Sequence, residues 1–302
     1  MAWLSALTEA ELWTLAMIVV ASAVYATALL AAGAVLFSLA FADLPDPQRR
    51  AASITVVIAA CSGQLMILLQ WLLQAGYLGG GNLASALDPT LLGIVFSGAP
   101  GTRLSMLLSG LVLVLALPLL KHRRPRLGQG LALVGVGLIV LAFTQVGHTT
   151  GEQSLLLGAL LCLHLLSAAF WVGSLWPLYH LAGNSGNHRL AADILARFGR
   201  IAAWAVGALL LAGLTLAALL LGGLSPLLGT AYGQFLLAKL AIVALLLLLA
   251  ASNKWRLVPA FQHGDSQAPR RLRRSIALEM ALVTLILLLT GALTTLSSPS
   301  GT

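Results

Sequence analysis

Residues 147–178 read GHTTGEQSLLLGALLCLHLLSAAFWVGSLWPL, a stretch that joins a short polar break to a long apolar run. His148 lies in the polar break, and His164 lies ten residues inside the run that begins at Ser154. An imidazole in hydrocarbon is costly unless it has a partner, so a histidine inside a membrane span is a functional-site hypothesis. Because histidine binds metals, haem iron and protons, the rest of the chain must decide among these roles and simple packing.

Apolar runs of this length recur along the chain. Of its 302 residues 59% are apolar and only 9% are charged, whereas a soluble domain carries about 25% charged residues. Segments of ~20 apolar residues occur at about 12–42, 51–75, 103–120, 129–147, 154–178, 198–222, 233–253 and 274–296. We therefore predict an all-α polytopic membrane protein, a bundle of eight transmembrane helices forming one domain over residues 1–302. The apolar piece at 90–97 is too short to cross and predicts a re-entrant or interfacial segment.

The basic residues are concentrated in alternate connections between these runs. Fifteen of the 17 Lys and Arg residues fall at 43–50, 121–128, 179–200 and 254–274. The exceptions are Arg103, on the other side, and Lys239, inside a run. By the positive-inside rule the basic connections are cytoplasmic. An even number of spans then places both termini outside, on the side opposite the cytoplasm (the periplasm in a bacterium).

The sequence offers no motif of a soluble enzyme. Walker, dinucleotide-binding and nucleophile-elbow patterns are all missing, so we expect neither enzymatic activity nor ATP-driven transport. The segment MAWLSALTEAELW lacks the basic region and cleavage site of a secretory signal, which predicts an uncleaved first helix. Cys61 and Cys162 both lie in apolar runs, which disfavours a structural disulfide.

The orientation assigns a depth to each soft side chain. His148 is expected at the outer surface, and His164 roughly 15 Å below it, near the midplane. Met66 is expected roughly 13 Å below the outer end of its run, while Met106 and Met17 lie in the outer halves of theirs. Thioether and imidazole ligands select copper, Cu(I) above all, over hard cations. The alternative is that each methionine only fills a gap between helices.

Helical spacing places polar groups on two faces. Steps of three and four residues join Met66, Gln70, Gln74 and Tyr77 on the second run. Similar steps join His164, Ser167, Ala168 and Trp171 on the fifth run. Cys162 projects to the opposite side of that helix, so it cannot chelate one ion together with His164 on a regular helix.

Two charged residues are predicted inside the bilayer. Lys239 lies about seven residues below the outer end of its run, and Glu279 about six residues above the inner end of its own. Their depths differ by roughly 10 Å, so a direct ion pair is not expected. Glu279 is instead nearer the level of Arg197, Arg200 and Asn253. A structural hydrogen-bonded network and a role in cation or proton passage both remain open for these charges.

Several segments resemble the copper resistance protein D (CopD) family. They are GHTTG, HLLSAAFWVGSLWPL, RFGRIA, GTAYGQFLLAKLAIV, SNKWRLVP and LRRSIALEMAL, and the likeness covers roughly residues 145–297. The resemblance implies movement of copper across a bacterial inner membrane, commonly as uptake, and a separate periplasmic copper-binding partner of the CopC kind. The family's motif positions carry over to His148, His164, Trp171, Lys239, Asn253 and Glu279.

The residues and the resemblance together give one working hypothesis. His148, with Met106 or Met17, receives copper; His164 and Met66 hold it midway; polar groups near Asn253 and Glu279 line the exit. One rival is a redox protein with b-type haem, which needs two histidines at matched depth, whereas His148 and His164 differ by roughly 15 Å. The other rival is a non-transporting scaffold that delivers copper to a partner.

Overall fold

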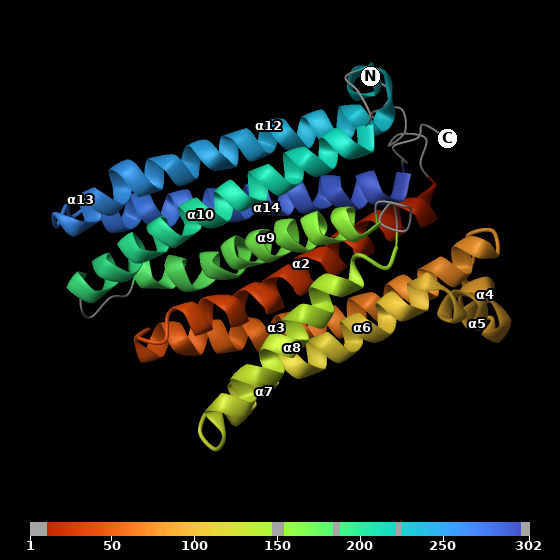
Figure 1. Ribbon diagram of the computed structural model, residues 1–302, viewed down its shortest axis with the longest axis horizontal. Coiled ribbons are helices and arrows are strands. Elements are labelled where there is room, and N and C mark those ends of the chain that lie inside the picture. Colours follow the sequence, from red (N-terminus) through yellow and green to blue (C-terminus); the bar gives the residue numbers. More distant parts are fainter. Residues whose placement is uncertain (1–10, 147–153, 184–187, 222–224, 297–302) are drawn as a thin grey trace.

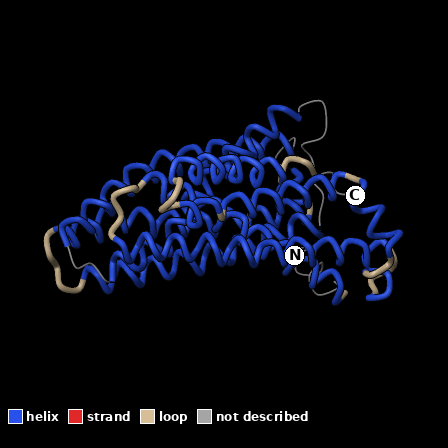
Figure 2. The backbone as a smooth tube through the Cα atoms, turned by 90° about the horizontal axis from the view of Figure 1, so that it is seen from below, coloured by secondary structure: helices blue, strands red, loops and turns tan. Residues whose placement is uncertain are grey.

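A computed structural model describes residues 11–146, 154–183, 188–221 and 225–296. The first half comprises α2 (Leu12–Ala40), α3 (Asp46–Leu78), α4 (Leu83–Ala86), α5 (Pro89–Ser97), α6 (Ala99–Val114), α7 (Ala116–Leu120) and α8 (Pro125–Ala142). The second half comprises α9 (Ser154–Gly183), α10 (His188–Leu221), α11 (Ser225–Gly229), α12 (Ala231–Ser252), the π-helical turn η2 (Asn253–Leu257), α13 (Val258–Gln262) and α14 (Ala268–Leu296). Figure 2 shows helices and loops but no strand among these residues.

Eight of these segments are long and apolar enough to cross a membrane, which confirms the predicted number of spans. They are α2, α3, α6 with α7, α8, α9, α10, α12 with η2 and α13, and α14. Several spans extend a few residues beyond the apolar runs at the basic ends, because helices continue into polar residues that lie outside hydrocarbon. The protein is therefore an all-α polytopic membrane protein.

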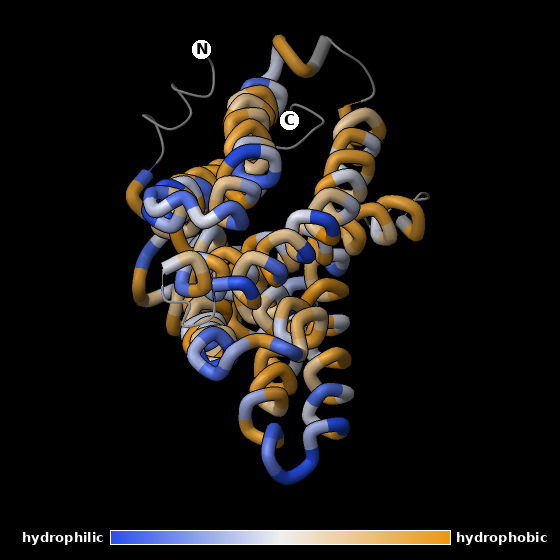
Figure 3. Tube along the Cα trace, turned by 90° about the vertical axis from the view of Figure 1, so that its left-hand side faces the viewer, coloured by the Kyte–Doolittle hydropathy of each residue, from blue (hydrophilic) through white to orange (hydrophobic). Residues whose placement is uncertain are grey.

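The four basic connections gather at one end of the bundle, which we call the basic end. In Figure 1 the α2–α3 and α7–α8 connections, the end of α9, the start of α10 and α13 all lie at this end. Figure 3 looks onto the same end and shows hydrophilic residues at the tips of the helices. The start of α2, the end of α14, and α4, α5 and α11 lie at the opposite end. The alternation required by the positive-inside argument is thus present in the fold.

The apolar piece at 90–97 forms the short helix α5, as its length predicted. Asp88 caps this helix by accepting hydrogen bonds from the backbone N–H groups of Leu91 and Thr90, and these bonds hold the pKa of the Asp88 carboxyl below its ordinary value. Trp71 of α3 donates its indole N–H to the Leu92 carbonyl at 3.3 Å and so fixes α5 against α3. The nine-residue helix covers one side of the bundle at the opposite end.

Small residues let the two halves of the bundle approach closely. A Cβ placed on Gly173 of α9 would lie 2.5 Å from the Cα of Gly33 on α2, and one on Gly33 would overlap the Ala169 carbonyl. Gly110 of α6 and Gly135 of α8 make a similar contact, with 2.7 Å between a Gly135 Cβ and the Gly110 oxygen. Close backbone approach at small residues is the usual basis of helix packing in lipid.

Two apolar clusters lie on either side of the α2–α9 contact. The first is formed mainly by α2, α3, α6 and α8, and includes Leu107, Leu111 and Ile139. The second is formed mainly by the basic-end halves of α9, α10 and α14 with α13, and includes Phe261 and Leu272. Consequently α2 and α9 form the spine of the bundle, with a different set of helices against each side.

Candidate functional site

His164 projects from α9 toward α10. Its Nδ1 lies 3.1 Å from the carbonyl oxygen of Leu209. Because a carbonyl only accepts hydrogen bonds, Nδ1 carries the proton and donates, which leaves the lone pair of a neutral ring on Nε2. Gly213 makes room for the ring, since a Cβ there would stand 3.0 Å from both Nδ1 and Cε1. A ring oriented by a backbone carbonyl is the arrangement that proteins use for metal-binding histidines.

Lys239 of α12 is the charged group that acts on His164. It is half-buried, and its ammonium is within electrostatic reach of the imidazole. A positive charge at this distance from the ring opposes a second cation there, more strongly in a protein interior than in water. Any ion held on His164 Nε2 is therefore bound against this repulsion.

Glu279, Asn253 and Trp171 form a hydrogen-bonded trio from three helical segments. Trp171 of α9 donates its indole N–H to Glu279 Oε2 at 3.2 Å, and Asn253 of η2 donates Nδ2–H to Glu279 Oε1 at 2.5 Å. Glu279 is only 3% exposed and Trp171 only 5%. π-helical turns such as η2 are rare in proteins, and those that occur are often found at functional sites.

The partner of Glu279 is thus Asn253, one of the three residues that its depth allowed. Arg197 instead donates to Asp43 in the α2–α3 connection, and its guanidinium lies 4.6 Å from the centre of the Phe41 ring. This hydrogen bond holds the pKa of Asp43 below its ordinary value. Arg200 is exposed.

A cavity of about 300 Å³ adjoins the trio and is called the basic-end cavity. Trp171 and Glu279 line it together with Asn253 and Lys254, and its other walls are mostly apolar side chains of α9 and α10. Asn253 Oδ1 is buried there and makes no hydrogen bond to the described part of the chain. The cavity therefore presents a carboxylate, a free amide oxygen and a nearby ammonium.

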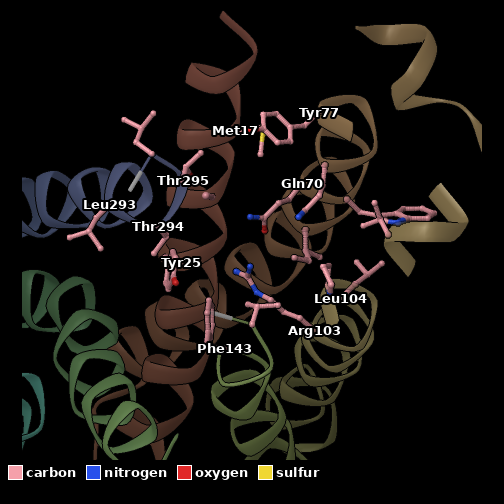
Figure 4. A pocket seen from close by; sticks show the side chains of 18 of the residues that line it. Met17, Tyr25, Gln70, Tyr77, Arg103, Leu104, Phe143, Leu293, Thr294 and Thr295 are labelled. Carbon is pink, nitrogen blue, oxygen red and sulfur yellow. The ribbon is translucent and has the colours of Figure 1, made fainter. Parts of the chain in front are cut away.

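A larger cavity of about 710 Å³ occupies the opposite end and is called the opposite-end cavity. Three members of the predicted polar stripe, Gln70, Gln74 and Tyr77, line it together with Met17. Figure 4 shows Met17, Gln70 and Tyr77 on one side of this space and Thr294 and Thr295 on another.

His164 lies between the two cavities on the same helices. Along α9 the order is Leu161 at the opposite-end cavity, then His164, then Trp171 at the basic-end cavity. Along α10 the order is Leu216, then Leu209 beside His164, then Val206. Steps of three and seven residues keep these positions on one face of each helix. Residues of the opposite-end cavity, His164 and residues of the basic-end cavity therefore follow one another along the α9–α10 interface.

Other predicted ligands lie elsewhere. Met66 of α3 and Met106 of α6 line neither cavity; they pack against the first apolar cluster, as the gap-filling alternative expects. Cys162 packs against the same cluster and points away from His164, as its spacing predicted. His148 lies outside the described residues. Within the described ranges, no three His, Cys, Asp or Glu side chains gather as a metal cluster.

Arg103 is the residue that sequence reasoning missed. It lines the opposite-end cavity, and its guanidinium lies 5.0 Å from the centre of the Phe143 ring. The Phe143 ring also stacks on the Tyr25 ring, with 4.6 Å between the ring centroids, and Tyr25 interacts electrostatically with Arg103. The available signal was its position, since Arg103 is the one basic residue outside both the basic connections and the apolar interior.

The fold and these buried polar groups define a multi-pass α-helical membrane protein with two cavities and a histidine, His164, between them. In a comparison with known proteins, the family model of copper resistance protein D matches residues 192–293, which cover most of α10, all of α12 and most of α14. Over this region the chain is similar to the copper resistance protein D family. No solved structure matches it.

Three curated relatives are similar to the chain. Copper transport protein CutJ of Bacillus subtilis is 29% identical over 244 residues, covering 78% of this chain and 44% of that protein. Inner membrane protein YebZ of Escherichia coli is 33% identical over 137 residues, covering 44% and 47%. Copper resistance protein D of Pseudomonas syringae pv. tomato is 33% identical over 175 residues, covering 54% and 56%. The chain thus spans about half the length of these relatives, and it is a multi-pass bacterial inner-membrane protein.

Proposed function

We propose that the protein moves copper across the bacterial inner membrane, from the periplasm to the cytoplasm. The observation that carries the proposal is the order of groups along the α9–α10 interface: opposite-end cavity, His164, basic-end cavity. In the proposed orientation the basic end faces the cytoplasm. The relatives named for copper transport and copper resistance supply the identity of the ion.

Copper enters the route at the opposite-end cavity in this proposal. The Met17 thioether lines that cavity, and His148 is proposed as the outer acceptor on the strength of its sequence position. Thioether and imidazole ligands favour Cu(I). Met66 and Met106 stay predicted ligands, with their packing against the apolar cluster as the competing explanation. A separate periplasmic copper-binding protein of the CopC kind is the proposed donor.

His164 is the proposed midway ligand. Its Nδ1–H is held by Leu209, which directs the Nε2 lone pair away from α10's backbone and leaves it available to an ion. Lys239 weakens binding at this point, and weak binding suits a site that must release its ion. The next group along the route is the Glu279 carboxylate, whose negative charge attracts the released cation toward the basic end.

The test is uptake of radiolabelled copper by cells expressing His164→Ala, with wild type at matched protein levels. His263→Ala is the control, because His263 is exposed and directly follows α13, which lies at the basic end. We expect uptake to fall to background in the first variant and to stay at the wild-type rate in the second. Wild-type uptake by His164→Ala would refute the midway site.

Reconstitution separates transport from delivery. Purified protein in liposomes, with no partner present, is expected to move copper into the lumen, and His164→Ala is expected to abolish that flux. A scaffold that only hands copper to a partner would give no flux in either case, so equal, background-level signals would overturn the transport proposal.

A further inference from the structure

Arg103 places an unpartnered positive charge in the opposite-end cavity. It lies one turn into α6, just after the Pro100 turn that follows α5. Its Nε and Nη2 atoms are shielded from solvent and make no hydrogen bond to the rest of the described chain. A guanidinium stays charged at every physiological pH and offers five N–H donors. Burying such a group without acceptors is strongly unfavourable, so this arrangement calls for an acceptor that the described part of the chain does not supply.

The neighbours of Arg103 do not neutralise it. Phe143 offers a ring face at 5.0 Å, which is a weak attraction, and Tyr25 is the phenol that interacts with it electrostatically. Gln70 faces the same space with its Oε1 buried and also without a hydrogen-bond partner. Figure 4 shows that Arg103, Gln70 and Tyr25, which come from three different helices, point into the same cavity. Two unsatisfied polar groups therefore share one cavity.

The charge of the cavity lining is positive. Among the described residues that line it there is one arginine and no lysine, aspartate or glutamate. Of the described carboxylates nearest in sequence to this lining, Glu11 is exposed and Asp88 is engaged in capping α5. A bare cation is repelled by such a lining, whereas an anion is attracted by it. Most of the remaining lining residues are apolar, among them Leu104, Leu157 and Leu161.

We propose that the opposite-end cavity binds an amphiphilic oxyanion, a carboxylate or phosphate group attached to an apolar body. The oxyanion accepts two hydrogen bonds from the Arg103 guanidinium, the geometry that arginine forms best. Gln70 and Tyr25 contact its polar head, and the leucine walls contact its apolar part. A volume of about 710 Å³ lies within the range of small-molecule sites. The proposal does not require copper passage, because Met17, the proposed copper ligand that also lines this cavity, takes no part in binding the oxyanion.

The experiment measures thermal stability of the purified full chain in nanodiscs of phosphatidylcholine. The probes are sodium octanoate, inorganic phosphate and, as an uncharged match for octanoate, 1-octanol. A further sample replaces part of the phosphatidylcholine by phosphatidylglycerol. We expect saturable stabilisation by octanoate and none by octanol, or stabilisation by phosphatidylglycerol. The first result assigns a soluble carboxylate and the second a lipid phosphate.

Variants assign the effect to the cavity. Arg103→Gln is expected to weaken half-saturation at least about tenfold, while Arg123→Gln, at an exposed arginine of the basic end, keeps wild-type binding. Arg103→Met is expected to be at least as stable as wild type without ligand, because it removes an unpaired buried charge. Absence of stabilisation by every charged probe, equal stabilisation of Arg103→Gln, or a large loss of stability in ligand-free Arg103→Met would overturn the proposal.

Discussion

Replacement of Glu279 separates its charge from its hydrogen bonds. Glu279→Ala leaves the indole N–H of Trp171 and the Nδ2–H of Asn253 without their acceptors at a site where the carboxylate is 3% exposed. Each buried donor left unpaired costs about 1–3 kcal/mol, so the two together are expected to lower the free energy of unfolding by about 2–6 kcal/mol. The cavity left by the removed atoms adds to this cost.

Glu279→Gln keeps the shape and loses the charge. Its amide oxygen accepts from Trp171, and its amide N–H₂ is satisfied if the Asn253 side chain turns to present Oδ1, an atom that is buried without a hydrogen bond in the described chain. The expected loss of stability is therefore below about 1.5 kcal/mol, the net worth of one ordinary hydrogen bond. Copper uptake is nevertheless expected to fall at least about tenfold, because the carboxylate no longer attracts the cation.

The assay pairs denaturant or thermal unfolding of the purified variants with copper uptake at matched protein levels. The reasoning requires Glu279→Ala to be clearly less stable than Glu279→Gln and both to transport poorly. Equal stabilities would show that the two hydrogen bonds contribute little. Wild-type uptake by a well-folded Glu279→Gln variant would remove Glu279 from the route and leave it a purely structural group.

Three further predictions concern packing, pH and colour. Gly173→Ala is expected to destabilise the bundle by about 1–3 kcal/mol, because the added Cβ overlaps Gly33. Gly137→Ala is the control: its Cβ meets no atom within 4 Å, so the change is expected to be neutral or stabilising by up to about 1 kcal/mol. The reverse order of stabilities in unfolding assays would contradict the α2–α9 contact. The Asp43–Arg197 pair is partly exposed and is worth about 0–1 kcal/mol. Because the folded pKa of Asp43 is lowered, the deficit of Asp43→Asn should be full above about pH 3.9 and vanish as the pH falls through the folded pKa. Purified protein is expected to carry copper without a Soret band, and a Soret band with α and β bands in its visible spectrum would favour haem.

Hydropathy and charge predicted most of the fold, because the order of apolar and basic segments along the chain determines the number of spans and the side on which each connection lies. A span of ~20 apolar residues has one stable arrangement in lipid, so the eight spans and their alternation followed directly. The depth of a side chain follows from its distance to the end of its helix. Depth correctly grouped Glu279 with Asn253, and helical spacing correctly separated Cys162 from His164.

The rotation of each helix about its axis could not be predicted in the same way. That rotation is set by packing against neighbours, here by contacts such as Gly33 with Gly173. Met66 and Gln70 lie one turn apart on α3, yet Gln70 lines the opposite-end cavity and Met66 packs against the apolar cluster. Shared depth therefore did not establish a shared site. The role of Arg103 was missed for the same reason, because only the packed bundle shows which helices it faces.

The order of charges along the proposed route constrains how copper travels. From the opposite end inward the groups are Arg103, then Lys239 beside His164, then the Glu279 carboxylate. Of these three described groups, a bare cation meets the two positive ones before the negative one, and in a low dielectric each positive group opposes its entry. An oxyanion on Arg103 would remove the first of these barriers. Copper uptake at low concentration is then expected to be faster in liposomes whose medium or lipid supplies that anion, and Arg103→Gln should make the uptake rate indifferent to it. An uptake rate that depends on the anion equally in wild type and Arg103→Gln would show that the two sites act separately.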